Sequence, residues 1–89
     1  MMFPYLTFAD ETEVTHSQVL MRNERQEIEV HFERATEDGF DEARCVLPSY
    51  EWIHRVGYSD DEIAFFVEFL QKNVHLLFQY AQEDGLNIA

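Results

Sequence analysis

The chain has 89 residues, of which 46% are hydrophobic and 15% aromatic, an apolar content that supports a folded domain and argues against disorder. The formal net charge is −12, because 18 acidic residues stand against 6 basic ones. This acidic excess argues against sequence-independent binding to nucleic acid and against docking on an anionic membrane surface, since both carry negative charge.

The sequence also limits where the protein works. One cysteine, Cys45, cannot form an internal disulfide, and no apolar run approaches the ~18 residues of a membrane-spanning helix. The first residues lack the basic segment and the long apolar segment of a signal peptide. We therefore expect residues 1–89 to form a single domain in a reducing cytoplasm.

Strands are predicted in the first half of the chain, at residues 3–8, 14–21, 26–34 and 42–47. The clearest pattern is that of residues 26–34, where Ile28, Val30 and Phe32 alternate with polar residues, as in a strand with one face in water. Turn residues at Asp10-Glu11, a polar tip at 22–25 and an acidic loop around Gly39 separate the strands.

Two helices are predicted to follow. Residues 49–55 fit a short helix with Ser49 as its N-cap and Gly57 as its C-terminal stop. Residues 59–84 fit a long helix that begins with a capping box formed by Ser59 and Glu62. Strands followed by helices predict an α+β fold, in which an antiparallel meander of about four strands carries the helices on one face.

The long helix is apolar on two sides. With about 100° of turn per residue, one stripe forms an ordinary core face, made of Ile63, Phe66, Val67, Leu70, Val74, Leu77, Phe78 and Ala81. We expect Ile63, Phe66 and Leu70 to bury Ile28, Val30 and Phe32, while Glu27, Glu29 and Glu33 face water.

The second stripe consists of Phe65, Phe69, Leu76 and Tyr80. Either residues 1–3 or the Trp52 helix folds over it, or another molecule covers it. We favour a homodimer in which the two helices pack against each other and these residues form the protein interface. A heterologous partner would instead be basic and would meet the acidic strand face of Glu27, Glu29 and Glu33.

A small metal- or ligand-binding protein that uses His16 and His31 on the exposed sheet face is the alternative function. A hairpin turn centred between Asn23 and Glu24 places His16 opposite His31, with Glu29 and Glu33 beside them. Two imidazoles and two carboxylates could hold a divalent cation, whereas a slip of one residue in the register destroys the cluster. The simpler interpretation is an exposed polar face with solvated histidines.

We expect no enzymatic activity and no cofactor. Cys45 has apolar neighbours in its predicted strand, which is typical of a small buried side chain and not of an activated nucleophile. The glycines, Gly39, Gly57 and Gly85, lie at predicted loops or caps, so none is left to build a phosphate-binding loop. The sequence is typical of a binding protein of unknown process.

Three segments carry a resemblance to a known group: FPYLTFADETEVTHSQ, VHFERATEDGFDEARCVLPSYEWI and YSDDEIAFFVEFLQKNVHLLFQYA. They resemble small acidic uncharacterised proteins encoded on conjugative transposons of gut Firmicutes. The resemblance implies a cytoplasmic accessory protein of a mobile element and brings no catalytic residue with it. The net charge of −12 adds an antitoxin or a mimic of nucleic-acid charge as a narrower hypothesis.

Overall fold

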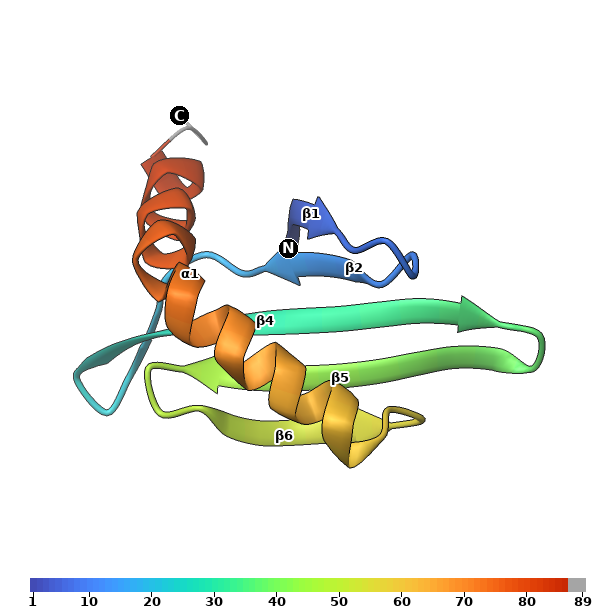
Figure 1. Cartoon of the computed structure of the whole chain (residues 1–89). Helices are drawn as coiled ribbons and strands as arrows, with labels where there is room; N and C mark the ends of the chain where they lie inside the picture. Colours follow the sequence, from blue (N-terminus) through green and yellow to red (C-terminus); the bar gives the residue numbers. More distant parts are fainter. Residues whose placement is uncertain (87–89) are drawn as a thin grey trace.

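The computed structural model describes residues 1–86, in which strands precede a C-terminal helix (Figure 1). The elements of this described part are β1 (Phe3–Thr7), β2 (Glu13–His16), β3 (Leu20–Arg22), β4 (Arg25–Thr36), β5 (Gly39–Leu47), β6 (Glu51–Val56) and α1 (Asp60–Leu86). All strand pairs are antiparallel, and α1 lies across one face of the sheet (Figure 1). The predicted α+β class with a long C-terminal helix on one sheet face is confirmed.

The sheet has more strands than the four predicted. Its order is β1-β2-β4-β5-β6, and β3 pairs with the first part of β4. The predicted strand at 14–21 is divided, because residues 17–19 leave the ladder between β2 and β3. The β4–β5 hairpin extends beyond the rest of the sheet (Figure 1).

The predicted short helix at 49–55 is wrong, since β6 occupies this segment and pairs with β5. Ser49 caps a turn and not a helix: its hydroxyl donates to the Val46 carbonyl at 3.3 Å and accepts the Glu51 N–H at 3.3 Å. Tyr50 has a φ of 61°, which reverses the chain within the turn. The β-branched and aromatic residues of 51–56 then supply the edge strand that β5 requires.

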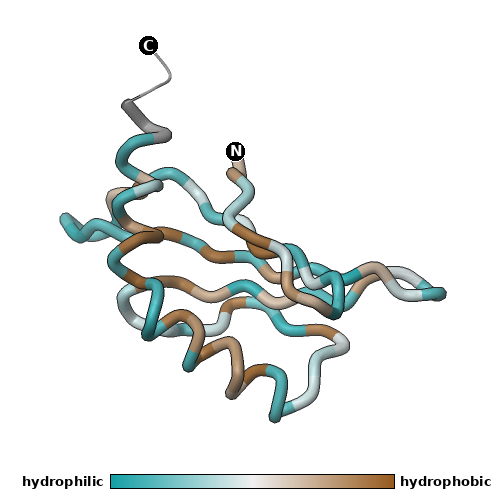
Figure 2. Tube along the Cα trace, turned by 45° about the horizontal axis from the view of Figure 1, so that its top comes forward, coloured by the Kyte–Doolittle hydropathy of each residue, from teal (hydrophilic) through white to brown (hydrophobic). Residues whose placement is uncertain are grey.

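The core forms between α1 and the sheet face beneath it. Ile28, Val30 and Phe32 are completely buried, as predicted, and Phe32 stacks on Phe66 of α1 with ring centres 4.2 Å apart. Figure 2 shows hydrophobic positions alternating with hydrophilic ones along the strands, as a sheet with one covered face requires. Each residue of the predicted core stripe of α1 is buried or half-buried.

The capping box at the start of α1 is confirmed. The Ser59 N–H donates to the Glu62 carboxylate at 2.9 Å, and the Glu62 N–H donates to the Ser59 hydroxyl at 3.2 Å. This reciprocal pair fixes the direction in which the first turns of α1 leave β6. Within residues 1–86, no helix is long and apolar enough to cross a membrane.

Candidate functional site

The predicted pairing of His16 with His31 is wrong by one residue. β3 and β4 have the expected register, with Leu20 opposite Glu27, but β2 places His16 opposite Val30 and Thr15 opposite His31. The irregular segment between β2 and β3 contains one residue more than the facing part of β4. This extra residue turns His16 to the core face. His16 is 1% exposed, and its Nδ1 lies 2.9 Å from the Ser17 carbonyl oxygen.

The proposed metal cluster therefore does not assemble. Glu29, His31 and Glu33 share the uncovered face of the sheet, whereas His16 lies on the other face among the rings of Phe3 and Tyr5. His31 Nε2 lies 3.0 Å from a Glu29 carboxylate oxygen. Among the described residues, no group of three or more His, Cys, Asp or Glu side chains is placed to hold a metal ion.

The acidic face of β4 is partly neutralised by the chain itself. Arg22 donates to Glu29 at 2.8 Å and lies 3.8 Å from Glu27, and hydrogen bonds from His31 and Arg22 lower the pKa of Glu29. Glu33 differs, because it stands opposite Glu13 on one side and Glu42 on the other. Glu13 and Glu33 have no ion-pair partner in the part of the chain that the structure describes, so their charges repel across the strands.

Cys45 is a core residue with no exposed surface. Burial raises the pKa of its thiol to about 12, so the thiolate needed for nucleophilic attack is absent at neutral pH. The Sγ–H points to the Val46 carbonyl oxygen at 3.8 Å.

The second stripe of α1 is covered in part by the N-terminal segment. Tyr5 of β1 packs against Phe69 and Tyr80 with ring centres 6.1 and 5.9 Å apart, and Phe8 packs against Phe69 at 4.9 Å. The Tyr5 hydroxyl also donates to the Asn73 side chain at 2.7 Å. Tyr5 and Phe8 thus cover the ring of Phe69. They are not the residues 1–3 that the sequence suggested for this role.

Three members of the stripe keep much of their surface in water after this packing. Phe65, Leu76 and Tyr80 are 52%, 43% and 41% exposed. At about 100° per residue they lie on the same side of α1. Tyr80 contacts Tyr5 of β1, and Phe65 contacts Phe8, which follows β1. We call Phe65, Leu76 and Tyr80 the apolar strip; they are the large hydrophobic side chains of α1 that stay exposed among the residues described.

A polar cluster joins the start of α1 to the sheet. Arg34, at the end of the buried face of β4, donates to Asp10 at 2.8 Å and to Asp41 at 2.7 Å, and it lies 3.0 Å from Glu62. Its guanidinium also lies over the Tyr58 ring, 5.0 Å from the ring centre. One cation therefore holds three carboxylates from three different segments.

The pKa values in this cluster reflect that arrangement. The hydrogen bond to Asp41 raises the pKa of Arg34 above its already high value, against the opposing effect of burial. Burial alone would raise the pKa of Asp10, but hydrogen bonds from Thr12 and the charge of Arg34 lower it. The pKa of Glu62 is lowered first by the Ser59 N–H and then by Arg34. Arg34, Asp10 and Glu62 are therefore charged at neutral pH.

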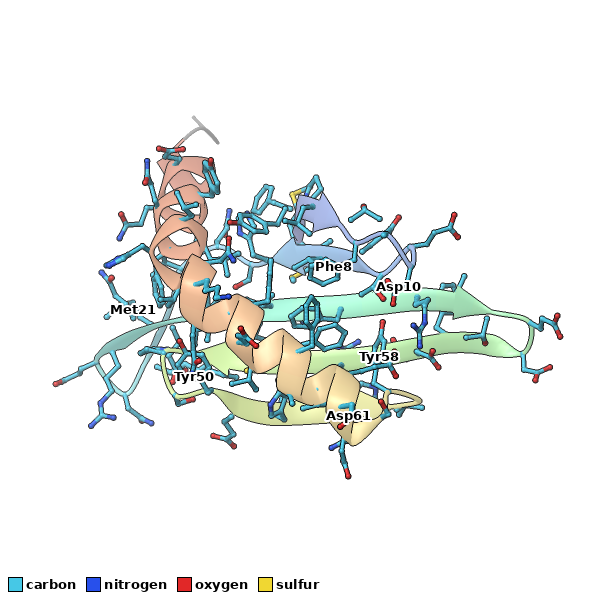
Figure 3. All side chains as sticks on the ribbon, in the orientation of Figure 1. Phe8, Asp10, Met21, Tyr50, Tyr58 and Asp61 are labelled. Atoms are coloured by element: carbon cyan, nitrogen blue, oxygen red, sulfur yellow. The ribbon has the colours of Figure 1, made fainter. Side chains whose placement is uncertain are left out.

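An open apolar pocket lies beside this cluster. Its volume is about 520 Å³, and its wall is made of Phe8, Ala9, Asp10, Asp61, Glu62, Phe65 and Phe66. Figure 3 shows Phe8 and Asp10 on the same side of the sheet as Asp61 at the start of α1. The floor is aromatic, since Phe8 stacks on Phe66 with ring centres 6.0 Å apart and meets Phe65 edge-on at 5.4 Å.

No pattern in the sequence predicts the cluster or the pocket. Their residues come from the β1–β2 turn, from β4 and β5 and from the first turns of α1, so no local pattern joins them. Arg34 is the one residue whose position hints at the cluster. It follows Phe32 on the core face of an alternating strand, and a cation there requires a partner.

Comparisons of this chain with protein-family models, with curated proteins and with solved structures find no match. The resemblance to accessory proteins of conjugative transposons therefore stays a prediction.

Proposed function

We propose that this chain is a non-enzymatic binding protein that associates through the apolar strip of Phe65, Leu76 and Tyr80, most simply with a second copy of itself. The observation that carries the proposal is that these side chains stay 41–52% exposed after β1 has packed on the helix. Burial of the one thiol and the lack of a metal cluster among the described residues favour a binding role over a catalytic one. We infer that it acts in the cytoplasm as an accessory or antitoxin-like protein of a mobile element.

The size of the strip sets the expected strength of association. Side chains of this size present roughly 150–250 Å² each, so three of them at about half exposure offer roughly 300 Å². A stable interface buries about 800 Å² on each partner, and the strip is well below that. We therefore expect a weak, concentration-dependent dimer in which α1 packs against its symmetry mate.

Salt distinguishes self-association from binding to a basic partner. Two copies that each carry a charge of −12 repel, so raising the salt concentration should tighten a homodimer by screening this repulsion. Sedimentation velocity from 5 to 500 µM, at 20 mM and 300 mM NaCl, measures both effects. The Leu76→Glu variant should be monomeric throughout, whereas Gln79→Glu, on the adjacent helix surface, adds the same charge and should still dimerise.

A strictly monomeric mass at 500 µM in high salt, identical for the parent protein and the Leu76→Glu variant, would exclude self-association through the strip. Equal weakening by Leu76→Glu and Gln79→Glu would show that added charge, and not loss of the apolar contact, causes the effect.

A basic heterologous partner is the second candidate, and one observation favours it. Glu13, Glu33 and Glu42 stand side by side across β2, β4 and β5 on the uncovered sheet face. A cationic partner would relieve their mutual repulsion. The test is calorimetric titration with decalysine: the Glu13→Gln/Glu33→Gln variant should bind several-fold more weakly than a control that neutralises Glu24 and Glu83. Equal affinities would reject this face as the docking surface.

A further inference from the structure

We propose that the pocket between the β1–β2 turn and the first turns of α1 receives a short basic segment of a partner protein. An apolar side chain of that segment enters the pocket, and an adjacent lysine or arginine meets the carboxylates on the rim. This second binding site shares Phe65 with the apolar strip and lies apart from Leu76 and Tyr80.

The interior of the pocket fits an apolar side chain. Its volume of about 520 Å³ lies within the roughly 300–1,000 Å³ of ordinary ligand pockets. Phe66 is 3% exposed and fixed by stacking on Phe32, so the floor is rigid. Phe65 forms a wall and is 52% exposed, which leaves one aromatic surface for an incoming group to cover.

The rim of the pocket is negatively charged. Asp10, Asp61 and Glu62 contribute three carboxylates, and the neighbouring Arg34 is already shared by Asp10, Glu62 and Asp41. Asp61 has no ion pair within residues 1–86. The amino-terminal end of a helix acts as roughly half a positive charge and opposes a cation, but the acids of the first turn outweigh it.

The open shape favours a side chain presented by a protein over a free small molecule. One side of the pocket faces solvent, whereas small ligands usually bury about 70–90% of their surface. A side chain anchored on a partner needs less enclosure, because the rest of the partner supplies further contacts. A cation beside an aromatic wall also gains from the ring of Phe65.

The test is an amide NMR titration of the full chain with the peptide acetyl-Phe-Lys-Lys-amide. Saturable shifts are expected at residues 8–10 and 61–66. Acetyl-Phe-Glu-Glu-amide should cause none, and acetyl-Gly-Lys-Lys-amide should bind at least several-fold more weakly. Asp61→Asn should weaken binding about two- to fivefold, the effect of one exposed ion pair. Phe65→Ala should weaken it several-fold.

Matched controls lie on the same helix. Glu83→Gln removes one charge far from the pocket, and Leu76→Ala removes apolar surface from the strip, so both should keep the parent affinity. No saturable binding, shifts centred on residues 76–80, or equal losses for Asp61→Asn and Glu83→Gln would overturn the proposal. If Asp61→Asn abolishes self-association in the sedimentation assay, the occupant is a second copy of this chain and the partner is wrongly assigned.

Discussion

Replacing Phe32 with alanine tests the arrangement of the core most directly. Phe32 has no exposed surface, and its ring stacks on Phe66 at 4.2 Å and lies 6.0 Å from the ring of Trp52. Removing a buried phenylalanine costs about 3–5 kcal/mol, and loss of a stacked aromatic partner adds about 0.5–1.5 kcal/mol. We expect a loss of about 4–5 kcal/mol, a large part of the roughly 5–10 kcal/mol that stabilises a domain of this size.

The same substitution at Phe40 is the matched control. Phe40 is 60% exposed near the tip of the β4–β5 hairpin, so its replacement by alanine should cost about 0.5 kcal/mol or less. Urea unfolding followed by the fluorescence of the single tryptophan, Trp52, measures both variants. If Phe32→Ala leaves the protein largely unfolded, Phe32→Leu gives a measurable loss of about 1–2 kcal/mol. Equal losses for Phe32→Ala and Phe40→Ala would refute this account of the core.

Two further predictions concern buried and paired groups. Cys45 should react with iodoacetamide at pH 8 only after urea unfolding, because burial raises its pKa to about 12; rapid labelling of the folded protein would contradict this. Arg34→Met should cost about 1–3 kcal/mol at pH 7, since it leaves three carboxylates facing one another at a partly exposed site. The lowered pKa values of Asp10 and Glu62 stabilise the fold above their unfolded pKa values, near pH 4, and this contribution is lost as the pH falls. The difference between the parent and Arg34→Met, measured by urea unfolding from pH 3 to 7, should therefore shrink at low pH, and a constant difference would reject the ion-pair explanation.

Features set by local periodicity could be predicted from the sequence. The alternation of Ile28, Val30 and Phe32 identified the buried face of β4, and the spacing of Phe66, Leu70 and Leu77 identified the core side of α1. Each of these patterns repeats with the period of its own element, so neighbouring residues determine it.

Features that depend on contacts between distant segments could not be predicted. Ser49 has the same short-range preference for a turn as for a helix N-cap, and pairing with β5 decides between them. The β5–β6 pairing also has a bulge at Arg44 and Cys45. The bulge interrupts the regular alternation of inward and outward residues in β6 and so hides its strand pattern. The pocket joins residues 8–10 to residues 61–66, a separation that no sequence window covers.

One extra residue between β2 and β3 separates the two registers with which these strands pair along β4. His16 lies opposite Val30 and Leu20 lies opposite Glu27, so the three residues that connect β2 to β3, 17–19, face only Ile28 and Glu29. One residue is therefore extra, and it allows both His16 and Val19 to reach the core side.

Deleting Gln18 should leave both registers intact, because the remaining residues then alternate regularly from His16 to Leu20. The cost should be no more than about 2 kcal/mol, the value of one or two hydrogen bonds that Ser17 makes around the bulge. Deleting Thr15 instead shifts the parity within β2 and should turn Val14, now 1% exposed, towards water. Circular dichroism and urea unfolding compare the two deletions. If the two deletions destabilise the protein equally, the extra residue does not set the register. The explanation of why His16 does not pair with His31 is then wrong.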